Sequence, residues 1–434
     1  MRRALLVLTV LALALAPSAG AAVRHAVPGG ATSGDCKATA CDFPTAVKSA
    51  QAGDEVDVAP GAYGSESSPI PAVTNARAIR VHGRAGKPRP RIVAEPAAPD
   101  YWGLGLFNPG ASVAHLQITA VGNGSGASAL GLSAARGDDL VVHSKVPTPG
   151  YAACSLYGGA VLTNSVCWAP AIQNASLGVG VGPRNPSPNA TITLRNVTVA
   201  SLGFSYALYA ATASGQAVTV RAVNSVFKAT YAVGLASEDG GGTLTFEPTY
   251  SNVVGQHDVE AGCCSEKPSS TNLSAGVLFV DPAGDFHQTP MSPTVNRGVN
   301  DPANGARDVD GQPRKIGGRT DIGADELLFP PLASTGPATK VRPRTAVLNG
   351  QGNPRGMGGT SAYFQLGRTQ AYGLTTSTVS LPRSSAAQPV SRSPGGLRPA
   401  TRYHYRLVVS GPGGVGRGGD RTFVTKAAPA ARGR

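Results

Sequence analysis

A short strand pattern that recurs between residues 78 and 246 restricts the fold more than any other feature of the sequence. In each unit, apolar and polar residues alternate over a few positions, and a loop rich in Gly, Pro and Ser follows. Such alternation is typical of strands with one buried face, and repeats of roughly 20 to 50 residues indicate a solenoid. The apolar positions that we take as equivalent are 21 to 34 residues apart: Ile79, Val113, Leu140, Val161, Ile192, Val218 and Leu244.

An asparagine also recurs before an apolar pair, at Asn164, Asn196, Asn224 and Asn252. Asn tolerates a left-handed backbone conformation and hydrogen-bonds its own turn, so stacked turns of one shape would place Asn at the same corner each time. The strands are separated by loops and not by helices, which excludes βαβ units. We therefore predict an all-β chain whose main part is a right-handed parallel β-helix, with coils stacked about 4.8 Å apart.

Composition and the N-terminal cap agree with this prediction. The 56 Gly and 35 Pro residues, with 15% charged and 6% aromatic residues, fit many short strands and turns. Residues 42–52 predict a cap helix, with Asp42 as N-cap, Pro44 in the first turn and Gly53 after the last turn. A solenoid needs such a cap because its open end exposes unpaired strand edges.

The N-terminus has the features of a secretory signal peptide, which we assign to residues 1–22. Arg2 and Arg3 precede an apolar run at 4–16, and the small residues 19–21 resemble a cleavage site. The run is too short to span a bilayer, which takes roughly 20 residues as a helix. We therefore expect a secreted protein, extracellular or at the cell surface, with no membrane span.

Six cysteines in an exported chain favour disulfides over metal binding. Fifteen pairings remain open, and the natural local pairs are Cys36 with Cys41 and Cys154 with Cys167. Chain entropy gives these loops about 2 and about 3 kcal/mol of stabilisation. The adjacent Cys263 and Cys264 form either a vicinal disulfide or a pair of thiols.

Two ends of the predicted β-helix resemble a known family. The segments 36–41, 53–58 and 60–63 resemble the opening of secreted β-helix proteins of the pectin-lyase-like superfamily. The motifs at 279–287, 308–314 and 321–326 resemble the closing segment of bacterial β-helix proteins with a choice-of-anchor Q domain. These resemblances imply one β-helix domain over residues 23–328.

A second resemblance covers the C-terminal part of the chain. After a Pro-rich linker at 329–343, residues 344–426 resemble a fibronectin type III domain, an immunoglobulin-like β-sandwich, and residues 427–434 predict a disordered tail. Leu397 to Tyr403 resembles the tyrosine corner of such sandwiches, in which the phenol bonds backward to the backbone. The resemblance implies a spacer or a binding unit.

Catalytic residues cannot be assigned from the sequence. Asp138 and Asp139 are the only acidic residues between Tyr101 and Ser237, and they match one of the four motifs of polygalacturonase-like hydrolases. We interpret them as turn residues. Two weaker candidates are the pair His115 and His143 and a group of acids with one histidine near residues 238–260. We interpret both as surface residues. The late group consists of Glu238, Asp239, His257, Asp258 and Glu260.

The densest group of carboxylates lies near the end of the predicted β-helix. Alternating acids before a Gly can gather oxygen ligands for calcium, but no complete calcium-binding loop is present. Hydrogen bonds that fix the last coil, with Arg307, Arg314 and Arg319 as partners, are the interpretation we favour. We therefore expect no cofactor, with calcium as the alternative. The candidate calcium ligands are Asp308, Asp310, Asp321, Asp325 and Glu326.

The net charge of the chain limits the classes of ligand that it is expected to bind. The chain has 38 Lys and Arg against 25 Asp and Glu, a formal net charge of +13. Basic residues are scattered and lack the clusters and interleaved aromatics of a nucleic-acid surface. We predict a non-catalytic protein that binds or adheres to extracellular polysaccharide or cell-wall polymer. The alternative is a polysaccharide lyase or glycosidase acting on an acidic polymer through basic residues such as Lys145, Arg195, Arg221 or Lys228.

Overall fold

The computed structural model describes residues 20–97, 101–122, 128–146, 152–169, 177–182, 188–201, 203, 205–316 and 318–429. Most of the predicted signal peptide (1–19) and the end of the predicted tail (430–434) lie outside these residues. Within the described ranges, no helix is both long and apolar enough to cross a membrane.

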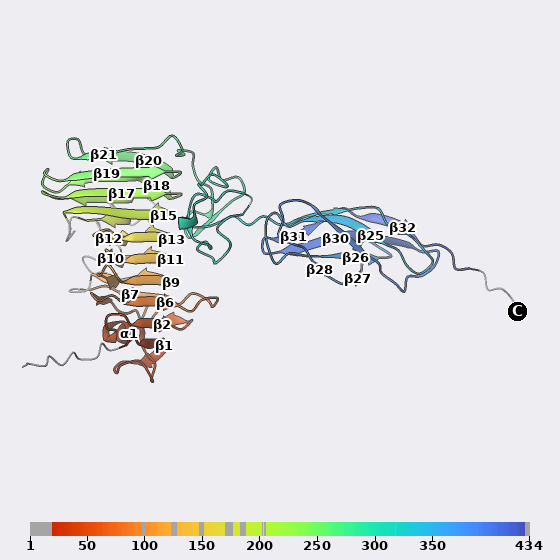
Figure 1. Ribbon diagram of the computed structural model, residues 1–434, viewed down its shortest axis with the longest axis horizontal. Coiled ribbons are helices and arrows are strands. Elements are labelled where there is room, and N and C mark those ends of the chain that lie inside the picture. Colours follow the sequence, from red (N-terminus) through yellow and green to blue (C-terminus); the bar gives the residue numbers. More distant parts are fainter. Residues whose placement is uncertain are drawn as a thin grey trace, which may run out of the picture.

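The first two thirds of the chain form a parallel β-solenoid with three sheets, which confirms the predicted β-helix (Figure 1). Every strand of a sheet pairs in parallel with the strand one coil later, for example Val56 with Val81 and Val81 with Val113. We call the three faces sheets A, B and C, in the order in which each coil enters them. Alternate residues point inward, so the buried core runs along the axis of the solenoid.

The strands divide among the faces as follows. Sheet A contains β1 (Val23–Ala31), β2 (Glu55–Val58), β6 (Arg80–Gly83), β17 (Ala217–Val223), β19 (Thr243–Thr249), β21 (Cys264–Glu266) and the first halves of β9 (Ser112–Ala120), β11 (Arg136–Ser144), β13 (Val161–Ala169) and β15 (Asn189–Ser201). Sheet B contains β3 (Ala62–Tyr63), β4 (Ile70–Pro71), β7 (Arg91–Glu95), the second halves of β9, β11, β13 and β15, and the first parts of β18 (Val226–Ser237) and β20 (Asn252–Val259). Sheet C contains β5 (Val73–Asn75), β8 (Trp102–Leu106), β10 (Ser128–Ser133), β12 (Ala152–Tyr157), β14 (Leu177–Val181), β16 (Tyr206–Thr212) and the second parts of β18 and β20.

A column of left-handed residues forms the corner between sheets A and B. Asn196 donates from Nδ2 to Oδ1 of Asn164 at 3.1 Å, and Asn224 donates to Asn196 at 3.2 Å. This asparagine ladder confirms the predicted corner for three of the four asparagines. The prediction for Asn252 is wrong, because Tyr250 takes the corner and Asn252 bonds the carbonyl of Ala275 instead. The residues with positive φ along the corner are His115, Asp139, Asn164, Asn196, Asn224 and Tyr250.

A cap helix covers the N-terminal end of the solenoid, and disulfides link parts of its chain. Helix α1 (Phe43–Ser49) begins after Asp42, whose carboxylate accepts from the N–H of Thr45 at 2.9 Å. The two predicted pairs, 36 with 41 and 154 with 167, are disulfides, and the second joins sheet C to sheet B inside the coil. Cys263 and Cys264 form a vicinal disulfide, which decides between the two alternatives left open.

The segment after the last coil, residues 272–328, turns back along the outside of the A/B corner (Figure 1). It contains β22 (Phe279–Asp281), β23 (Asp285–Gln288) and the short 3-10 helix η1 (Pro302–Asn304). We call it the closing segment. The N–H groups of Gly323 and Ala324 donate to Asn224 and Thr198 of the solenoid at 2.8 and 2.9 Å. The acids near this corner are therefore not limited to Asp138 and Asp139, because the closing segment brings its own acids there.

The C-terminal part is a β-sandwich of two antiparallel sheets. One sheet contains β24 (Leu332–Thr335), β25 (Leu348–Asn353) and β29 (Gln388–Arg392). The other contains β26 (Ser361–Gly367), β27 (Leu374–Thr375), β28 (Val379–Ser380), β30 (Arg402–Gly411), β31 (Gly414–Arg417) and β32 (Arg421–Val424). The Tyr403 hydroxyl accepts from the N–H of Arg398 at 3.0 Å, which is the geometry expected of a tyrosine corner. Strand β24 lies within the predicted linker, so the sandwich begins earlier than the sequence indicated.

Candidate functional site

The predicted calcium ligands Asp308 and Asp321 are buried and bonded to backbone N–H groups. Asp308 accepts from residues 310, 312 and 326, and Asp321 accepts from residues 296 and 327. Burial raises the pKa of Asp308 to about 7 and that of Asp321 to about 6. These bonds hold separate turns of the closing segment together, which is the structural role that the sequence favoured.

Glu326 belongs to the same buried network. Its Oε1 accepts from the N–H of Asp321 at 2.9 Å and lies 3.5 Å from Nη1 of Arg314. Burial raises the pKa of Glu326 to about 9, and the neighbouring Asp321 carboxylate adds to the shift. Of the predicted arginine partners, Arg314 is buried in this network, whereas Arg307 and Arg319 bond to carbonyl oxygens.

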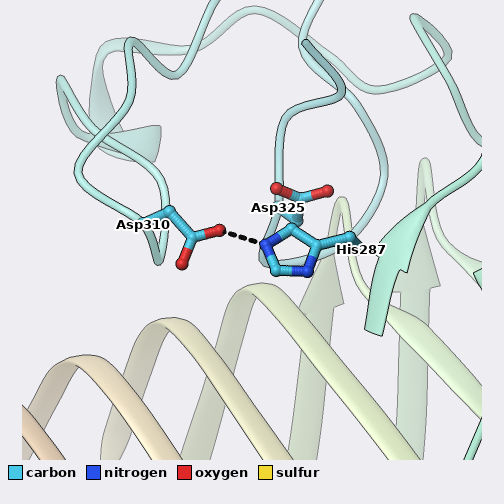
Figure 2. A group of neighbouring side chains, drawn as sticks. All are labelled: His287, Asp310 and Asp325. Carbon is cyan, nitrogen blue, oxygen red and sulfur yellow. Dashed lines mark hydrogen bonds and ion pairs between the residues drawn. The ribbon is translucent and has the colours of Figure 1, made fainter. Parts of the chain in front are cut away.

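One group of side chains in the closing segment could hold a metal ion, and Figure 2 shows it. His287 from β23, Asp310 and Asp325 offer ligand atoms that all lie within 4.8 Å of one another. Among the described residues, no such group includes Asp308, Asp321 or Glu326. Only two of the five predicted calcium ligands therefore converge, and a histidine that the sequence did not suggest joins them.

A proton competes with a metal for this group. Nε2 of His287 lies 2.6 Å from Asp310, and Nδ1 is bonded to Asp285. The hydrogen bond to Asp310 is the main reason that the pKa of His287 rises to about 10. At neutral pH the ring is therefore an imidazolium that links β23 to the loop that carries Asp310. A nitrogen and two carboxylates would suit a transition metal such as zinc, once Nε2 loses its proton.

The candidate catalytic acids are engaged in hydrogen bonds and ion pairs. Asp138 accepts from Nδ2 of Asn164 at 2.9 Å. Asp139 lies 2.6 Å from Nδ1 of His115 and 2.5 Å from Nη2 of Arg89, and burial raises its pKa. The other ring nitrogen of His115 bonds the carbonyl of Lys87 at 2.9 Å. With both nitrogens bonded, His115 has no free site to act as a general base.

His143 does not occupy the position equivalent to His115. It pairs in register with Thr119 on sheet B, and its ring stacks on Trp168 with centroids 3.8 Å apart. The late group is divided as well. The Tyr206 hydroxyl donates to Asp258 at 2.7 Å, and His257 bonds Glu266 at 2.9 Å.

The basic residues of the enzyme alternative do not converge on one site. Arg195 pairs with Asp301 at 3.1 Å, and Arg221 pairs with Glu247 at 3.0 Å. Lys145 pairs with an exposed glutamate, Glu66. Lys228 donates to the carbonyl of residue 277 at 3.0 Å. Each cation thus has its own partner.

Sequence reasoning missed two groups of aromatic side chains on the outer face of sheet C, separated by β14, a strand without an aromatic residue. We call the two groups together the aromatic surface. Tyr101 is 38% exposed, and the other six rings are half-buried. Trp102 contacts Phe107 with centroids 4.8 Å apart, and Tyr206 stacks on Tyr231 at 4.9 Å. The members are Tyr101, Trp102, Phe107, Tyr157, Tyr206, Tyr209 and Tyr231.

Glycines in register allow these rings to lie against the sheet. One outward column of sheet C contains Gly105, Gly131, Gly180 and Gly234 on different coils. A Cβ at Gly131 would lie 2.4 Å from the ring of Trp102, and one at Gly234 would lie 2.5 Å from that of Tyr206. A side chain at Gly131 or Gly234 would therefore push the neighbouring ring off the sheet. The sequence contains these aromatic and glycine residues, but which ring meets which glycine follows from the register between coils.

Such a surface suits ligands with alternating apolar and polar edges. Aromatic rings bury a large apolar area at low entropic cost, and a tyrosine hydroxyl adds a hydrogen-bonding group at the rim. The C–H faces of a pyranose ring stack on aromatic faces, while its hydroxyls remain hydrated. One group lies on the coils of β8 to β12 and the other on those of β16 and β18, so an extended chain along sheet C would contact both groups.

No protein-family model and no curated protein matches the chain. A solved pectate lyase, Pel9A, is 13% identical with a TM-score of 0.37, and the match covers 71% of this chain and 96% of that chain. The sensor domain of the anti-sigma factor RsgI4 of Pseudobacteroides cellulosolvens is 19% identical with a TM-score of 0.20, over 23% of this chain and 97% of that domain. We draw no functional conclusion from these similarities.

Proposed function

We propose that this protein is extracellular and binds polysaccharide or cell-wall polymer through the aromatic surface, without cleaving it. The single observation that carries the proposal is the set of half-buried rings on sheet C, of which Trp102 and Tyr206 lie close against glycines of the next coil. Asp138 and Asp139, the acids that a hydrolase mechanism would use, lie at the A/B corner. Their hydrogen bonds leave them no free role there.

The rest of the proposal follows from the resemblances in the sequence. The three disulfides suit an oxidising compartment, in line with the predicted signal peptide. The closing segment would act as a choice-of-anchor Q-like end of the solenoid. The sandwich would act as a fibronectin type III-like spacer that holds the solenoid away from its attachment point.

Affinity electrophoresis of the full chain in gels that contain single polysaccharides tests the proposal. Neutral, uronate-rich and wall-derived polymers form the panel. Trp102→Ala and Tyr206→Ala should each abolish most of the retardation that a bound polymer causes. Tyr363→Ala is the matched control, because it removes a half-buried tyrosine from β26 of the sandwich. Wild-type mobility in every gel would contradict the proposal.

Incubation with the same polymers separates binding from catalysis. A lyase would produce unsaturated uronate ends, and a glycosidase would produce new reducing ends. We expect neither product over a long incubation. Product that accumulates with wild type and is reduced by loss of Asp139 or His115 would favour the enzyme alternative.

A further inference from the structure

A cavity of about 850 Å³ lies between sheet A and the closing segment. One wall is β6 with the loop that follows it, and the start of β9 forms the floor. The opposite wall is the turn at residues 307–311. Small-molecule sites are usually roughly 300–1,000 Å³, so the cavity can hold a sugar residue or a short oligosaccharide.

Each of the two acids that line this cavity already has a basic partner. Asp139 is bonded by Arg89 and by His115, both within 2.6 Å. Asp310 is bonded by the ring of His287 at 2.6 Å, on the side shown in Figure 2. Neither carboxylate therefore has its charge available to balance a cation inside the cavity.

The basic residues of the cavity are less compensated. Lys87 and Arg307 are exposed, and neither forms an ion pair with another described residue. Arg307 donates only to the carbonyl of Gly311. Arg80 lies 3.6 Å from Glu55, a long contact that leaves much of the guanidinium free. The cavity thus has an excess of positive charge on both of its walls.

The floor of the cavity is held in place before any ligand binds. His115 has φ 55°, and its two ring nitrogens bond to Asp139 and to the carbonyl of Lys87. The second bond fixes the backbone that carries the Lys87 ammonium. Preorganisation of this kind lowers the entropic cost of binding.

We propose that this cavity binds an anionic sugar unit, with Lys87 and Arg307 on either side of its carboxylate or phosphate. The inference rests on the proposed function, since it adds a charge-selective site to a polysaccharide-binding protein. Arg307 offers a planar fork of donors that matches either anion, and Lys87 adds a point charge. The cavity lies on sheet A, whereas the aromatic surface lies on sheet C, so the two sites can be tested separately.

Isothermal titration of the full chain with short oligosaccharides tests this inference. One arm uses trigalacturonate, a second uses an oligomer of glycerol phosphate, and a third uses a neutral trisaccharide of similar size. We expect one of the two anionic ligands to bind and the neutral one not to bind. The combined change Lys87→Ala with Arg307→Ala should weaken binding at least about tenfold, and Lys87→Arg should retain it.

The matched control removes the same charge from the sandwich. Arg402 and Arg417 are exposed there, and their combined change to Ala should leave binding unchanged. Equal binding by the Lys87 and Arg307 variant, or binding of the neutral trisaccharide at the same affinity, would overturn the inference. If the double variant is unstable, Lys87→Ala alone replaces it in the titration. The Lys87 side chain forms no ion pair or hydrogen bond with another described residue, so its loss should not affect folding.

The result also separates this inference from the proposed function. Retardation by polymer that depends on Trp102, with no binding of either anionic oligomer, would refute the cavity and leave the aromatic surface. Binding of an anionic oligomer that depends on Lys87, with no retardation by any polymer, would refute the aromatic surface and leave the cavity.

Discussion

The Nη2 atom of Arg314 donates a hydrogen bond of 2.8 Å to Oδ1 of Asn164, 150 residues earlier in the chain. Asn164 is the first member of the asparagine ladder, and Arg314 is the buried cation of the closing segment. The same guanidinium donates to the carbonyl oxygens of residues 323 and 324. One side chain therefore joins the terminal turns to the corner of the solenoid.

Arg314→Met should destabilise the protein severely. It would leave the side-chain oxygen of Asn164 and the carbonyl oxygens of residues 323 and 324 without this donor, and each buried acceptor left unsatisfied costs about 1–3 kcal/mol. Urea unfolding followed by circular dichroism measures the effect. Arg297→Met is the control, since Arg297 is exposed and should change stability by less than about 0.5 kcal/mol. Equal stability of the two variants would show that the guanidinium does not hold the closing segment.

The asparagine ladder should depend on both side chain and backbone. Asn196 is fully buried with φ 52°, and it donates to Asn164 and to the carbonyl of Asn304. Asn196→Gly should cost roughly 1–3 kcal/mol through lost hydrogen bonds. Asn196→Ala should cost about 1–2 kcal/mol more, because Ala is strained in the left-handed region. Equal free energies of unfolding for the two variants would contradict the backbone contribution.

The positions of residues that repeat from coil to coil could be predicted from the sequence. The contacts that the closing segment makes could not. Alternation and the spacing of Asn164, Asn196 and Asn224 predict the coils and their corner, since each coil contacts its neighbours in a fixed register. The equivalence of Asn252 failed because Tyr250, two residues earlier, lies opposite Asn224 at the corner. No period places residue 287 beside residue 310.

The aromatic surface was missed for a different reason. The alternation along sheet C indicates the buried positions, and half-buried rings at strand edges carry no period-two signal. Trp102, for example, contacts Phe107 across Gly105 on the outer face. The pairing of a ring on one coil with a glycine on the next becomes visible only when the register between coils is known.

Stability should fall as the pH rises from about 4 to about 8. The pKa of Asp308 is raised to about 7, so the folded state holds a proton that the unfolded chain releases near pH 4. The contribution of Asp308 to the free energy of unfolding is therefore complete below about pH 4, and it is lost as the pH rises through about 7. His287 acts in the same direction, and its contribution is lost as pH rises through about 10.

Melting temperatures measured from pH 5 to pH 8 test this sign. We expect a lower melting temperature at pH 8, and a smaller decrease in Asp308→Asn than in wild type. The slope with pH is the readout, because the amide also changes the hydrogen bonds of the turn. A wild-type melting temperature that rises over this range would contradict the assigned burial of Asp308.

Calcium should have little effect on stability. Asp308 and Asp321 use their oxygens on backbone N–H groups, so they have little capacity left for a hard cation. Addition of calcium, or of a chelator, should therefore leave the melting temperature unchanged. A ligand that binds the folded state raises stability with its concentration. A rise with calcium that Asp310→Asn abolishes would instead support the calcium alternative.

The central claim, that the rings on sheet C bind polysaccharide, has a direct optical test. The chain has two tryptophans, Trp102 on the aromatic surface and Trp168, whose buried Nε1 has no hydrogen-bond partner among the described residues. Trp168→Phe therefore keeps the ring contact with His143 and leaves Trp102 as the single reporter. Titration of this variant with the polymer that retards the wild type should shift the tryptophan emission in a saturable way. An emission spectrum that stays constant while the polymer binds would place the binding site elsewhere and contradict the account.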